Sequence, residues 1–127
     1  MSRIVIDSSC WLEFFADSEV GKEIALLTKD IKAVIVPTVV IFEVFKKLMA
    51  EKGDDAAIFT IAQFRQAEIV DLTQEIALQA AKNSKEYKLA MADSIIYTIA
   101  RKYDAILHTQ DKHFQDLFLV KYYSKNG

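Results

Sequence analysis

The sequence predicts an α/β fold, a three-layer sandwich in which a mainly parallel sheet of four to five strands lies between helices. Short apolar runs with strand character alternate along the chain with longer segments of helical periodicity. Strands separated by helices cannot pair as hairpins, so consecutive strands are expected to run parallel, with right-handed crossovers that place helices on both faces. With only three glycines and one proline, the chain has no segment of linker composition. We therefore expect residues 1–127 to form a single domain.

The first half of the chain predicts two strands and four helices. In order, these are a strand at 4–6, a helix at 8–15, a helix capped by Ser18 that reaches Ile31, a strand at 33–36, a helix at 38–53 and a helix at 54–64. Pro37 should stop the second strand, and Thr38 offers a side-chain cap for the helix that follows. Gly53 suits the C-terminal end of that helix.

The second half predicts three more strands and two more helices. In order, these are a strand at 68–72, a helix capped by Thr73 that runs to Ser84, a helix at 89–100, a strand at 105–109 and a strand at 119–123. The aromatic residues of the early helices are expected first of all in the core, and a surface for a dimer or another protein partner is the alternative if they are exposed. These residues are Trp11, Phe14, Phe15, Phe42, Phe45 and Phe64.

One predicted helix carries a carboxylate on its apolar side. At helical spacing the neighbours of Asp93 on the same face are Leu89, Ala90, Ile96 and Tyr97. A carboxylate directed toward a core costs several kcal/mol unless a cation or a set of hydrogen bonds meets it. Asp93 is therefore expected to have such a partner.

Composition excludes several classes of protein. The net charge of −2 gives no overall attraction to nucleic acid, so a phosphate-bearing substrate would need local basic patches or bound metal. Cys10 is the only cysteine, which allows no internal disulfide, and a buried small hydrophobe is the favoured reading. The first residues meet a charge too early for a signal peptide, and no apolar run approaches the ~20 residues of a membrane helix. We expect a cytoplasmic protein with no membrane partner.

Four acidic residues are expected at the edge of the sheet where the parallel strands end. Asp7 directly follows the first strand, and Asp111 lies two residues past the fourth. Glu43 lies in the first two turns of the helix that leaves the second strand, and Asp93 lies in the first turns of the helix that leads to the fourth. A helix antiparallel to its strands begins at their carboxyl ends, which is where open α/β sheets bind ligands.

Carboxylates gathered at one edge repel each other unless a cation compensates them. Mg²⁺, or Mn²⁺ in its place, prefers oxygen ligands and keeps waters that can act as nucleophiles. Zinc fits poorly, because the chain offers only two histidines and one cysteine distant in sequence. A carboxylate-held metal pocket favours phosphoryl chemistry, because the metal polarises the phosphate, orients water and neutralises the developing charge.

Four segments of the chain resemble the PIN-domain ribonucleases, and the size of the chain is similar to that of the VapC-type toxins of toxin-antitoxin pairs. The segments are Ile4-Val5-Ile6-Asp7-Ser8-Ser9, Val40-Ile41-Phe42-Glu43-Val44, Ala92-Asp93-Ser94-Ile95-Ile96-Tyr97 and Thr109-Gln110-Asp111-Lys112-His113-Phe114. Together they extend over nearly the whole chain. Their order, spacing and placement on predicted elements are more specific than any one segment.

The resemblance implies a parallel sheet ordered 3-2-1-4-5 and Mg²⁺- or Mn²⁺-dependent hydrolysis of single-stranded RNA. By the same resemblance, the acidic catalytic and metal-site residues are Asp7, Glu43, Asp93 and Asp111. Ser9 and Thr109 are candidate supporting hydrogen-bond donors, and Asp116 is an alternative to Asp111 because the last acid varies in position within the family. Besides RNA, the implied partners are a cognate VapB-like antitoxin and a second copy of the chain in a homodimer.

Basic residues that could hold an RNA backbone are spread along the chain. They are Lys46, Lys47, Lys82, Lys85, Lys88, Arg101 and Lys112. The two histidines, His108 and His113, are expected to be structural and are assigned no role. The antitoxin is expected to place a basic side chain in the acidic pocket and a helix along an apolar groove.

Each acid also has a structural alternative. Asp7 could cap the helix that follows it, Glu43 could lie on a solvated helix face, and Asp93 could cap its helix or form an ion pair with a residue such as Lys88. Asp111 could be an ordinary turn residue. Their joint placement favours the metal site.

Three other functions remain open at this point. A phosphatase of the haloacid-dehalogenase type needs a second Asp two residues after the first, where Ser9 stands. A response-regulator receiver domain could use Asp71 as its phosphoacceptor, but it needs an acidic pair after the first strand, where only Asp7 is present. The third alternative is a PIN-like protein that binds RNA or a partner without cutting. A surface that only binds an anionic ligand has little use for four gathered acids.

Overall fold

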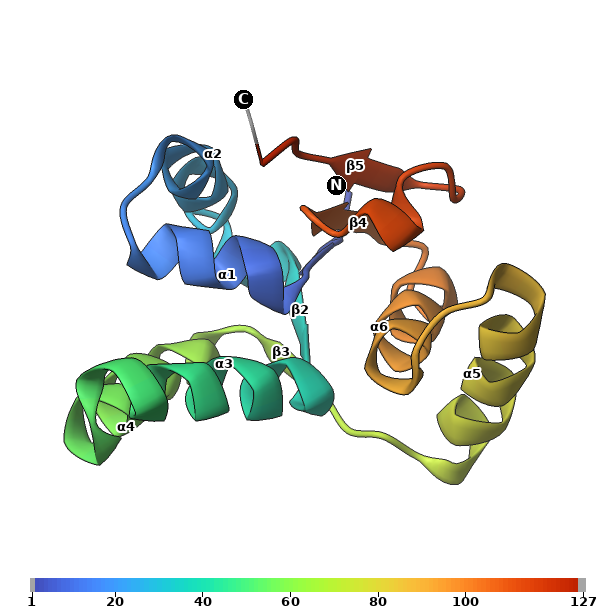
Figure 1. Cartoon of the computed structure of the whole chain (residues 1–127), viewed down its shortest axis with the longest axis horizontal. Helices are drawn as coiled ribbons and strands as arrows, with labels where there is room; N and C mark the ends of the chain where they lie inside the picture. The colour runs from blue at the N-terminus through green and yellow to red at the C-terminus, as the bar shows by residue number, and fades with distance from the viewer. Residues whose placement is uncertain (1, 126–127) are drawn as a thin grey trace.

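Five strands form one sheet in the order β3-β2-β1-β4-β5 in the computed structural model, which describes residues 2–125 (Figure 1). The strands are β1 (Ile4–Ile6), β2 (Val34–Pro37), β3 (Glu68–Val70), β4 (Ile106–Thr109) and β5 (Val120–Tyr122). Every neighbouring pair is parallel. The parallel sheet expected from the alternating pattern is therefore confirmed, as is the strand order implied by the resemblance.

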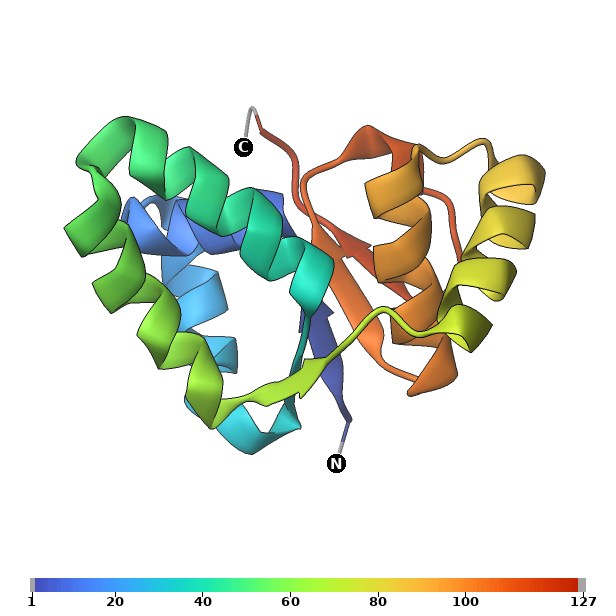
Figure 2. The same cartoon turned by 90° about the horizontal axis from the view of Figure 1, so that it is seen from below.

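Six α-helices cover the two faces of this sheet. They are α1 (Ser8–Phe15), α2 (Glu19–Leu27), α3 (Thr38–Lys52), α4 (Asp54–Ala62), α5 (Gln74–Tyr87) and α6 (Met91–Lys102). Helices α1 to α4 lie on one side of the sheet, and α5 and α6 lie on the other (Figures 1 and 2). This is the predicted three-layer sandwich. None of the helices within residues 2–125 has the length and apolar character needed to cross a bilayer.

Local side-chain chemistry explains several helix ends. The hydroxyl of Ser18 accepts from the backbone N–H of Gly21 at the start of α2, and the hydroxyl of Thr73 accepts from Ile76 at the start of α5. Gly53, with φ of +88°, ends α3 in a conformation that side chains rarely adopt. The predicted caps at Ser18 and Thr73 and the predicted helix end at Gly53 are therefore confirmed.

Other boundaries differ from the prediction. Thr38 is not a cap: it is the first residue of α3, and the N-cap is Pro37, whose φ of −63° suits a strand that passes directly into a helix. Helix α2 ends at Leu27, so Ile31 lies instead in η1, the 3-10 helix Ile31–Ala33. Strand β3 ends at Val70, opposite Pro37, because β2 offers no further partner beyond that residue.

The core consists of continuous apolar strands and the inner faces of the helices. Strands β1 and β2 are buried along their whole length, as expected for a parallel sheet covered on both faces. Cys10 is fully buried, as predicted. Trp11 and Phe64 lie in the core with ring centroids 4.7 Å apart, whereas Phe42 is 64% exposed, so the expectation of a core position was wrong for Phe42. Residue 42 lies on the outer face of α3, one position before Glu43.

Candidate metal and active site

The four acids predicted to converge line one pocket of about 440 Å³ at the carboxyl edge of the sheet. Asp7 connects β1 to α1, Glu43 lies in the second turn of α3, Asp93 lies in the first turn of α6, and Asp111 follows β4. The full lining of the pocket is Asp7, Ser8, Ser9, Leu12, Glu43, Asp93, Gln110, Asp111, Lys112 and Lys125. Segments as distant as residues 7 and 111 meet because β1 and β4 are neighbours in the sheet.

Asp7 is the most buried of the four acids, with 4% of its surface exposed. Its Oδ2 accepts hydrogen bonds from the hydroxyls of Ser9, at 2.9 Å, and Thr109, at 2.8 Å, while its Oδ1 has only a longer 3.5 Å contact with Ser8. Although Asp7 is the N-cap residue of α1, its side chain makes no capping hydrogen bond. Capping therefore does not explain why a carboxylate stands here.

The hydroxyls of Ser9 and Thr109, the two expected supporting residues, each link the Asp7 carboxylate to the backbone that follows β4. Ser9 accepts from the backbone N–H of Gln110 at 3.1 Å, and Thr109 accepts from that of Asp111 at 2.9 Å. Each hydroxyl thus accepts from one backbone group and donates to Asp7. This network sets the orientation of the Asp7 carboxylate and the path of the chain toward Asp111.

Glu43 is half-buried and not on a solvated helix face. The hydroxyl of Ser8 donates to Glu43 Oε1 at 3.0 Å, which orients the carboxylate toward Asp7. Burial raises the pKa of Glu43, and the charges of Asp7 and Asp111 raise it further, against the Ser8 hydrogen bond that lowers it. Burial likewise raises the pKa of Asp7, opposed by the hydrogen bonds from Thr109 and Ser9.

Asp93 and Asp111 face each other across the pocket, and one proton is most easily held on Asp93. Burial, followed by repulsion from Asp111 and Asp7, raises the pKa of Asp93 from 3.8 to about 7. Burial acts in the same sense on Asp111, but hydrogen bonds from the backbone and side chain of His113 and from Asp93 outweigh it and hold the pKa of Asp111 below its ordinary value.

The structural alternatives for Asp93 are not found in the structure. The N-cap of α6 is Ala90, without a side-chain cap. Among residues 2–125 no cation forms a salt bridge with Asp93, and Lys88 is exposed in the left-handed turn that ends α5. Helix α6 therefore places the Asp93 carboxylate beside the other pocket acids, and no cation among residues 2–125 forms an ion pair with it.

The two candidates for the last acid differ in their position relative to the pocket. Asp111 lines the pocket, whereas Asp116 is exposed and lies outside its lining. Of the basic residues expected to contact RNA, Lys112 alone is among the side chains that line this pocket.

Four residues of the pocket lining had no assigned role at the level of sequence, namely Ser8, Leu12, Gln110 and Lys125. His113 lies beside the pocket, with its Nδ1 2.7 Å from Asp111 Oδ1. Ser8 was detectable, since it directly follows Asp7 at the start of a helix. Lys125 was not, because only the fold brings the end of the chain back over α1. His108 is buried with Nδ1 2.8 Å from the hydroxyl of Tyr123, and burial lowers its pKa to about 4.

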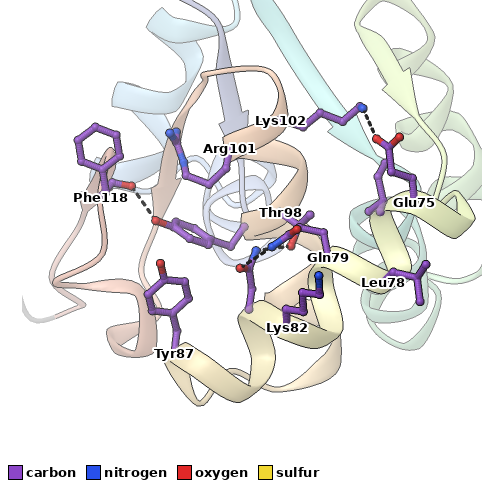
Figure 3. Close-up of a pocket in the computed structure, with 12 residues that line it drawn as sticks. Glu75, Leu78, Gln79, Lys82, Tyr87, Thr98, Arg101, Lys102 and Phe118 are labelled. Carbon is purple, nitrogen blue, oxygen red and sulfur yellow. Dashed lines mark hydrogen bonds and ion pairs between the residues drawn. The ribbon is translucent and has the colours of Figure 1, made fainter.

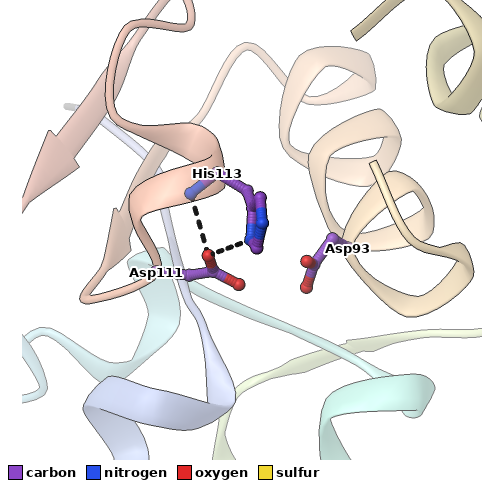
Figure 4. A group of neighbouring side chains, drawn as sticks. All are labelled: Asp93, Asp111 and His113. Atoms are coloured by element: carbon purple, nitrogen blue, oxygen red, sulfur yellow. Dashed lines mark hydrogen bonds and ion pairs between the residues drawn. The ribbon is translucent and has the colours of Figure 1, made fainter. Parts of the chain in front are cut away.

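The donor set fits a hard divalent cation. Carboxylate oxygens are the ligands that Mg²⁺ and Mn²⁺ prefer, and Asp93, Asp111 and His113 each offer one ligand atom within 4.8 Å of the others (Figure 4). A bound cation would lower the raised pKa values of Asp7, Glu43 and Asp93 by stabilising their charged forms.

A larger hollow, of about 650 Å³, lies between α5 and α6 (Figure 3). Its only acidic lining residue, Glu75, is paired with Lys102 at 2.7 Å. Tyr87, Tyr97 and Phe118 form an aromatic wall, but the hollow has no gathered carboxylates or nucleophile. This hollow therefore lacks the cluster of carboxylates that lines the smaller, acidic pocket.

Comparison with known proteins identifies the family of the chain. A family model of the PIN domain matches residues 4–117. The chain belongs to the PIN domain family. No curated protein matches the chain in sequence.

Solved structures of toxin-antitoxin proteins share the fold. A toxin-antitoxin complex from Klebsiella pneumoniae has a TM-score of 0.77 at 19% identity, covering 93% of this chain and 95% of its own. DNA-bound VapBC from Salmonella typhimurium has a TM-score of 0.74 at 13% identity, with coverages of 97% and 98%. The sarcin-ricin loop cleaving toxin VapC20 of Mycobacterium tuberculosis has a TM-score of 0.74 at 18% identity, with coverages of 95% and 99%. At these identities the likeness shows the PIN fold.

The repulsion within the pocket predicts that Asp93 destabilises the metal-free protein at alkaline pH. Asp93→Asn should be more stable than the parent at pH 8 in EDTA, by roughly 1 kcal/mol after allowance for solvent screening. The folded-state pKa of about 7 lies above the ordinary 3.8, so the parent is favoured when Asp93 is protonated and loses stability as the pH rises through 7.

The advantage of the variant should accordingly be smaller at pH 5, because most of the loss of parental stability occurs between pH 5 and pH 7, and it should disappear only below pH 3.8, where Asp93 is protonated in the folded and the unfolded chain. Urea unfolding of both proteins at pH 8 and pH 5 measures this difference. His108, whose lowered pKa acts in the opposite sense below pH 6.5, is present in both proteins and cancels in the comparison. Equal free energies of unfolding for the parent and Asp93→Asn at pH 8 would show that the Asp93 charge does not destabilise the folded protein.

Proposed function

We propose that this PIN-domain chain is an endoribonuclease that depends on Mg²⁺, for which Mn²⁺ can substitute, and that it is the toxin of a VapBC-type toxin-antitoxin pair. The observation that carries the proposal is the convergence of Asp7, Glu43, Asp93 and Asp111 on one pocket. The VapC20 structure, described as a sarcin-ricin loop cleaving toxin, supports RNA as the class of substrate.

In the proposed reaction a water oxygen forms a bond to phosphorus while the P–O3′ bond breaks, leaving a 5′-phosphate and a 3′-hydroxyl. Asp7, Asp93 and Asp111 would hold a divalent cation, which supplies neutralisation of the phosphate charge and a lowered pKa of bound water. Glu43, oriented by Ser8, would position the attacking water and is placed to accept its proton, a role that its raised pKa favours. Lys112 and Lys125 line the same pocket and would contact RNA phosphates.

The fold disfavours the receiver alternative. A phosphoacceptor must lie beside the acid that follows the first strand, but β3, which precedes Asp71, is an edge strand separated from β1 by β2. The phosphatase alternative lacks its second acid, since Ser9 donates to Asp7 at that position. A PIN protein that binds RNA without cutting remains the rival to be tested.

With Mg²⁺ or Mn²⁺ present, we expect the purified chain to cut single-stranded RNA, and EDTA to stop the reaction. Asp7→Asn and Asp93→Asn should each lower kcat/KM by at least ~100-fold, because each removes a charge that holds the cation where transition-state charge develops. Gel analysis of total cellular RNA, with circular dichroism to verify folding, provides the measurement.

Asp116→Asn is the matched control, since it makes the same change on an exposed acid outside the pocket, and it should cut at the parental rate. Metal binding and RNA binding without cleavage would support the silent PIN alternative. Full activity in Asp7→Asn and Asp93→Asn would exclude the proposed site.

The proposed antitoxin site follows α1 away from the acidic pocket. That pocket shares Ser9, Leu12, Gln110 and Lys125 with an adjoining hollow of about 460 Å³ between α1 and α3. This second hollow shares Phe15 with a third, of about 230 Å³, whose walls include Trp11, Phe14 and Phe64. A VapB-like segment with an apolar face could occupy the aromatic end and reach the acids with a basic side chain. The VapBC complexes among similar structures support this kind of partner.

Expression of the parent chain in a bacterial host should arrest growth, whereas Asp93→Asn should be harmless because cleavage is lost. If the assignment is correct, a small protein is encoded beside the chain, and its co-expression should restore growth and give a complex that co-purifies with the chain. Growth curves and affinity purification give the two measurements. Harmless expression of an active nuclease, with no partner recovered, would speak against the toxin assignment and leave the nuclease assignment intact.

We also propose a homodimer, which rests on the resemblance and on apolar surface near the site. Phe42 of α3 and Met91 of α6 are 64% and 75% exposed, and each lies within two residues of a pocket acid. Sedimentation at micromolar concentration should give the mass of two chains, and Phe42→Glu should give one, since a buried unpaired charge opposes association. A parental protein that sediments as a monomer would contradict the proposed homodimer.

A further inference from the structure

The hollow of about 650 Å³ between α5 and α6 carries positive charge that the acidic pocket does not use. Of the basic residues expected to contact RNA, Lys82 and Arg101 line this hollow, together with Lys102. Its only acidic lining residue, Glu75, is paired with Lys102. The hollow is therefore a local basic patch on a chain whose net charge is −2, which is what binding of a phosphate-bearing ligand requires.

The guanidinium of Arg101 is held in place, but its hydrogen-bonding capacity is not used up. It lies 5.8 Å from the ring centroid of Tyr97 and 5.3 Å from that of Phe118, and its Nη2 donates to the carbonyl of Ala105. Within residues 2–125, Nε has no acceptor, and Nη1 has only a 3.8 Å contact with the exposed Asp104. A guanidinium held in this way can donate to an anionic oxygen with little further loss of side-chain freedom.

Exposed aromatic rings lie beside these cations. Phe118, in the turn before β5, is 69% exposed, and Tyr87, at the end of α5, is 38% exposed. The ring of Tyr87 meets that of Tyr97 edge-on, with centroids 5.7 Å apart (Figure 3). Proteins hold single-stranded nucleic acid with these two components, because bases stack on the rings and the cations contact the phosphates.

The hollow is near enough to the acids for one RNA strand to reach both. Asp93, Tyr97 and Arg101 follow one another at intervals of four residues along α6. With a rise of 1.5 Å per residue, Tyr97 and Arg101 lie about 6 and 12 Å beyond Asp93 along the helix axis. Successive phosphates of a stacked strand are about 3.4 Å apart along its axis, so a few nucleotides span this interval.

We infer that the hollow between α5 and α6 is a second RNA-binding site, which holds a single-stranded part of the substrate by base stacking on Phe118 and Tyr87 and by phosphate contacts from Lys82 and Arg101. The inference rests on the proposed function for the identity of the ligand, but it concerns none of the four acids. Stacking accepts any base, so the site adds affinity without reading sequence. A protein partner is the competing occupant, because exposed aromatic rings also occur in protein interfaces.

The first experiment compares Lys82→Glu with Lys32→Glu. Both variants reverse one exposed charge, but only residue 82 lines the hollow, and residue 32 lies outside the acidic pocket as well. Fluorescence anisotropy of a labelled single strand of about 12 nucleotides, in EDTA so that the strand stays intact, gives the Kd of the full chain. Lys82→Glu should bind at least ~5-fold more weakly, with the salt dependence of binding reduced by about one counterion, whereas Lys32→Glu should bind as the parent does.

Stacking is tested with Phe118→Leu and Phe118→Trp. Leucine keeps the apolar bulk without a π face, so the affinity for the same strand should fall by ~5-fold or more, whereas tryptophan should retain the parental affinity. Circular dichroism verifies that the variants are folded. In Mg²⁺-dependent cleavage of the same strand, Lys82→Glu and Phe118→Leu should raise KM and leave kcat unchanged, because the acids are intact.

The outcomes separate the second site from the nuclease activity. RNA affinity that depends on Lys82 and Phe118 in a chain that cuts no RNA would support the second site and contradict the nuclease. Cleavage by a chain whose RNA affinity is unchanged in Lys82→Glu and Phe118→Leu would overturn the second site alone. Equal weakening in Lys82→Glu and Lys32→Glu would also overturn it, since only overall charge would then matter. Loss of a dimer in Phe118→Leu, with unchanged RNA affinity, would assign the hollow to a protein partner instead.

Discussion

The buried carboxylate of Asp7 is the contact on which the arrangement of the site depends. It ends β1, the central strand of the sheet, and its Oδ2 receives hydroxyl hydrogen bonds from Ser9 on α1 and from Thr109 at the end of β4. Because the same hydroxyls accept from the backbone of residues 110 and 111, the strand ends and the chain toward Asp111 form one hydrogen-bonded unit. A buried ion is tolerated only when its oxygens are satisfied in this manner. The position of Asp111 thus follows from the satisfaction of Asp7.

Hydroxyl groups donate to Asp7 and Glu43, and His113 donates to Asp111, but these hydrogen bonds do not balance the negative charges of the pocket. Burial and mutual repulsion raise the pKa values of Asp7, Glu43 and Asp93 together, which means that the folded chain disfavours its own fully ionised pocket. The gathered carboxylates lower the stability of the folded chain, and their repulsion is relieved only when a positive charge enters the pocket. Such a conflict between local stability and placement is characteristic of functional sites.

Much of the fold and most of the acid cluster could be predicted from sequence because both follow from short-range patterns. Apolar runs of three to five residues separated by helices require a parallel sheet, and acids placed just after strands must meet at its carboxyl edge. The predicted boundaries are wrong where pairing between strands sets the end of an element. Strand β3 ends at Val70 because its partner β2 ends at Pro37, and residues 71 and 72 carry no local sequence signal of that end. The place of Lys125 in the pocket lining could not be predicted for a related reason, because it depends on the return of the chain end to α1, which has no sequence pattern.

The same charge imbalance links the proposed metal with the proposed antitoxin. A pocket whose Asp93 carboxyl holds a proton near neutral pH can be ionised by any cation of suitable size, whether a divalent ion or the head of a lysine or arginine side chain. Both would use the oxygens of Asp7, Asp93 and Asp111, so they cannot occupy the pocket together. In the proposed pair, inhibition then requires no change of fold. The antitoxin would replace the cation electrostatically, and the hollows that continue along α1 would give its apolar residues the additional contacts that a single ion lacks.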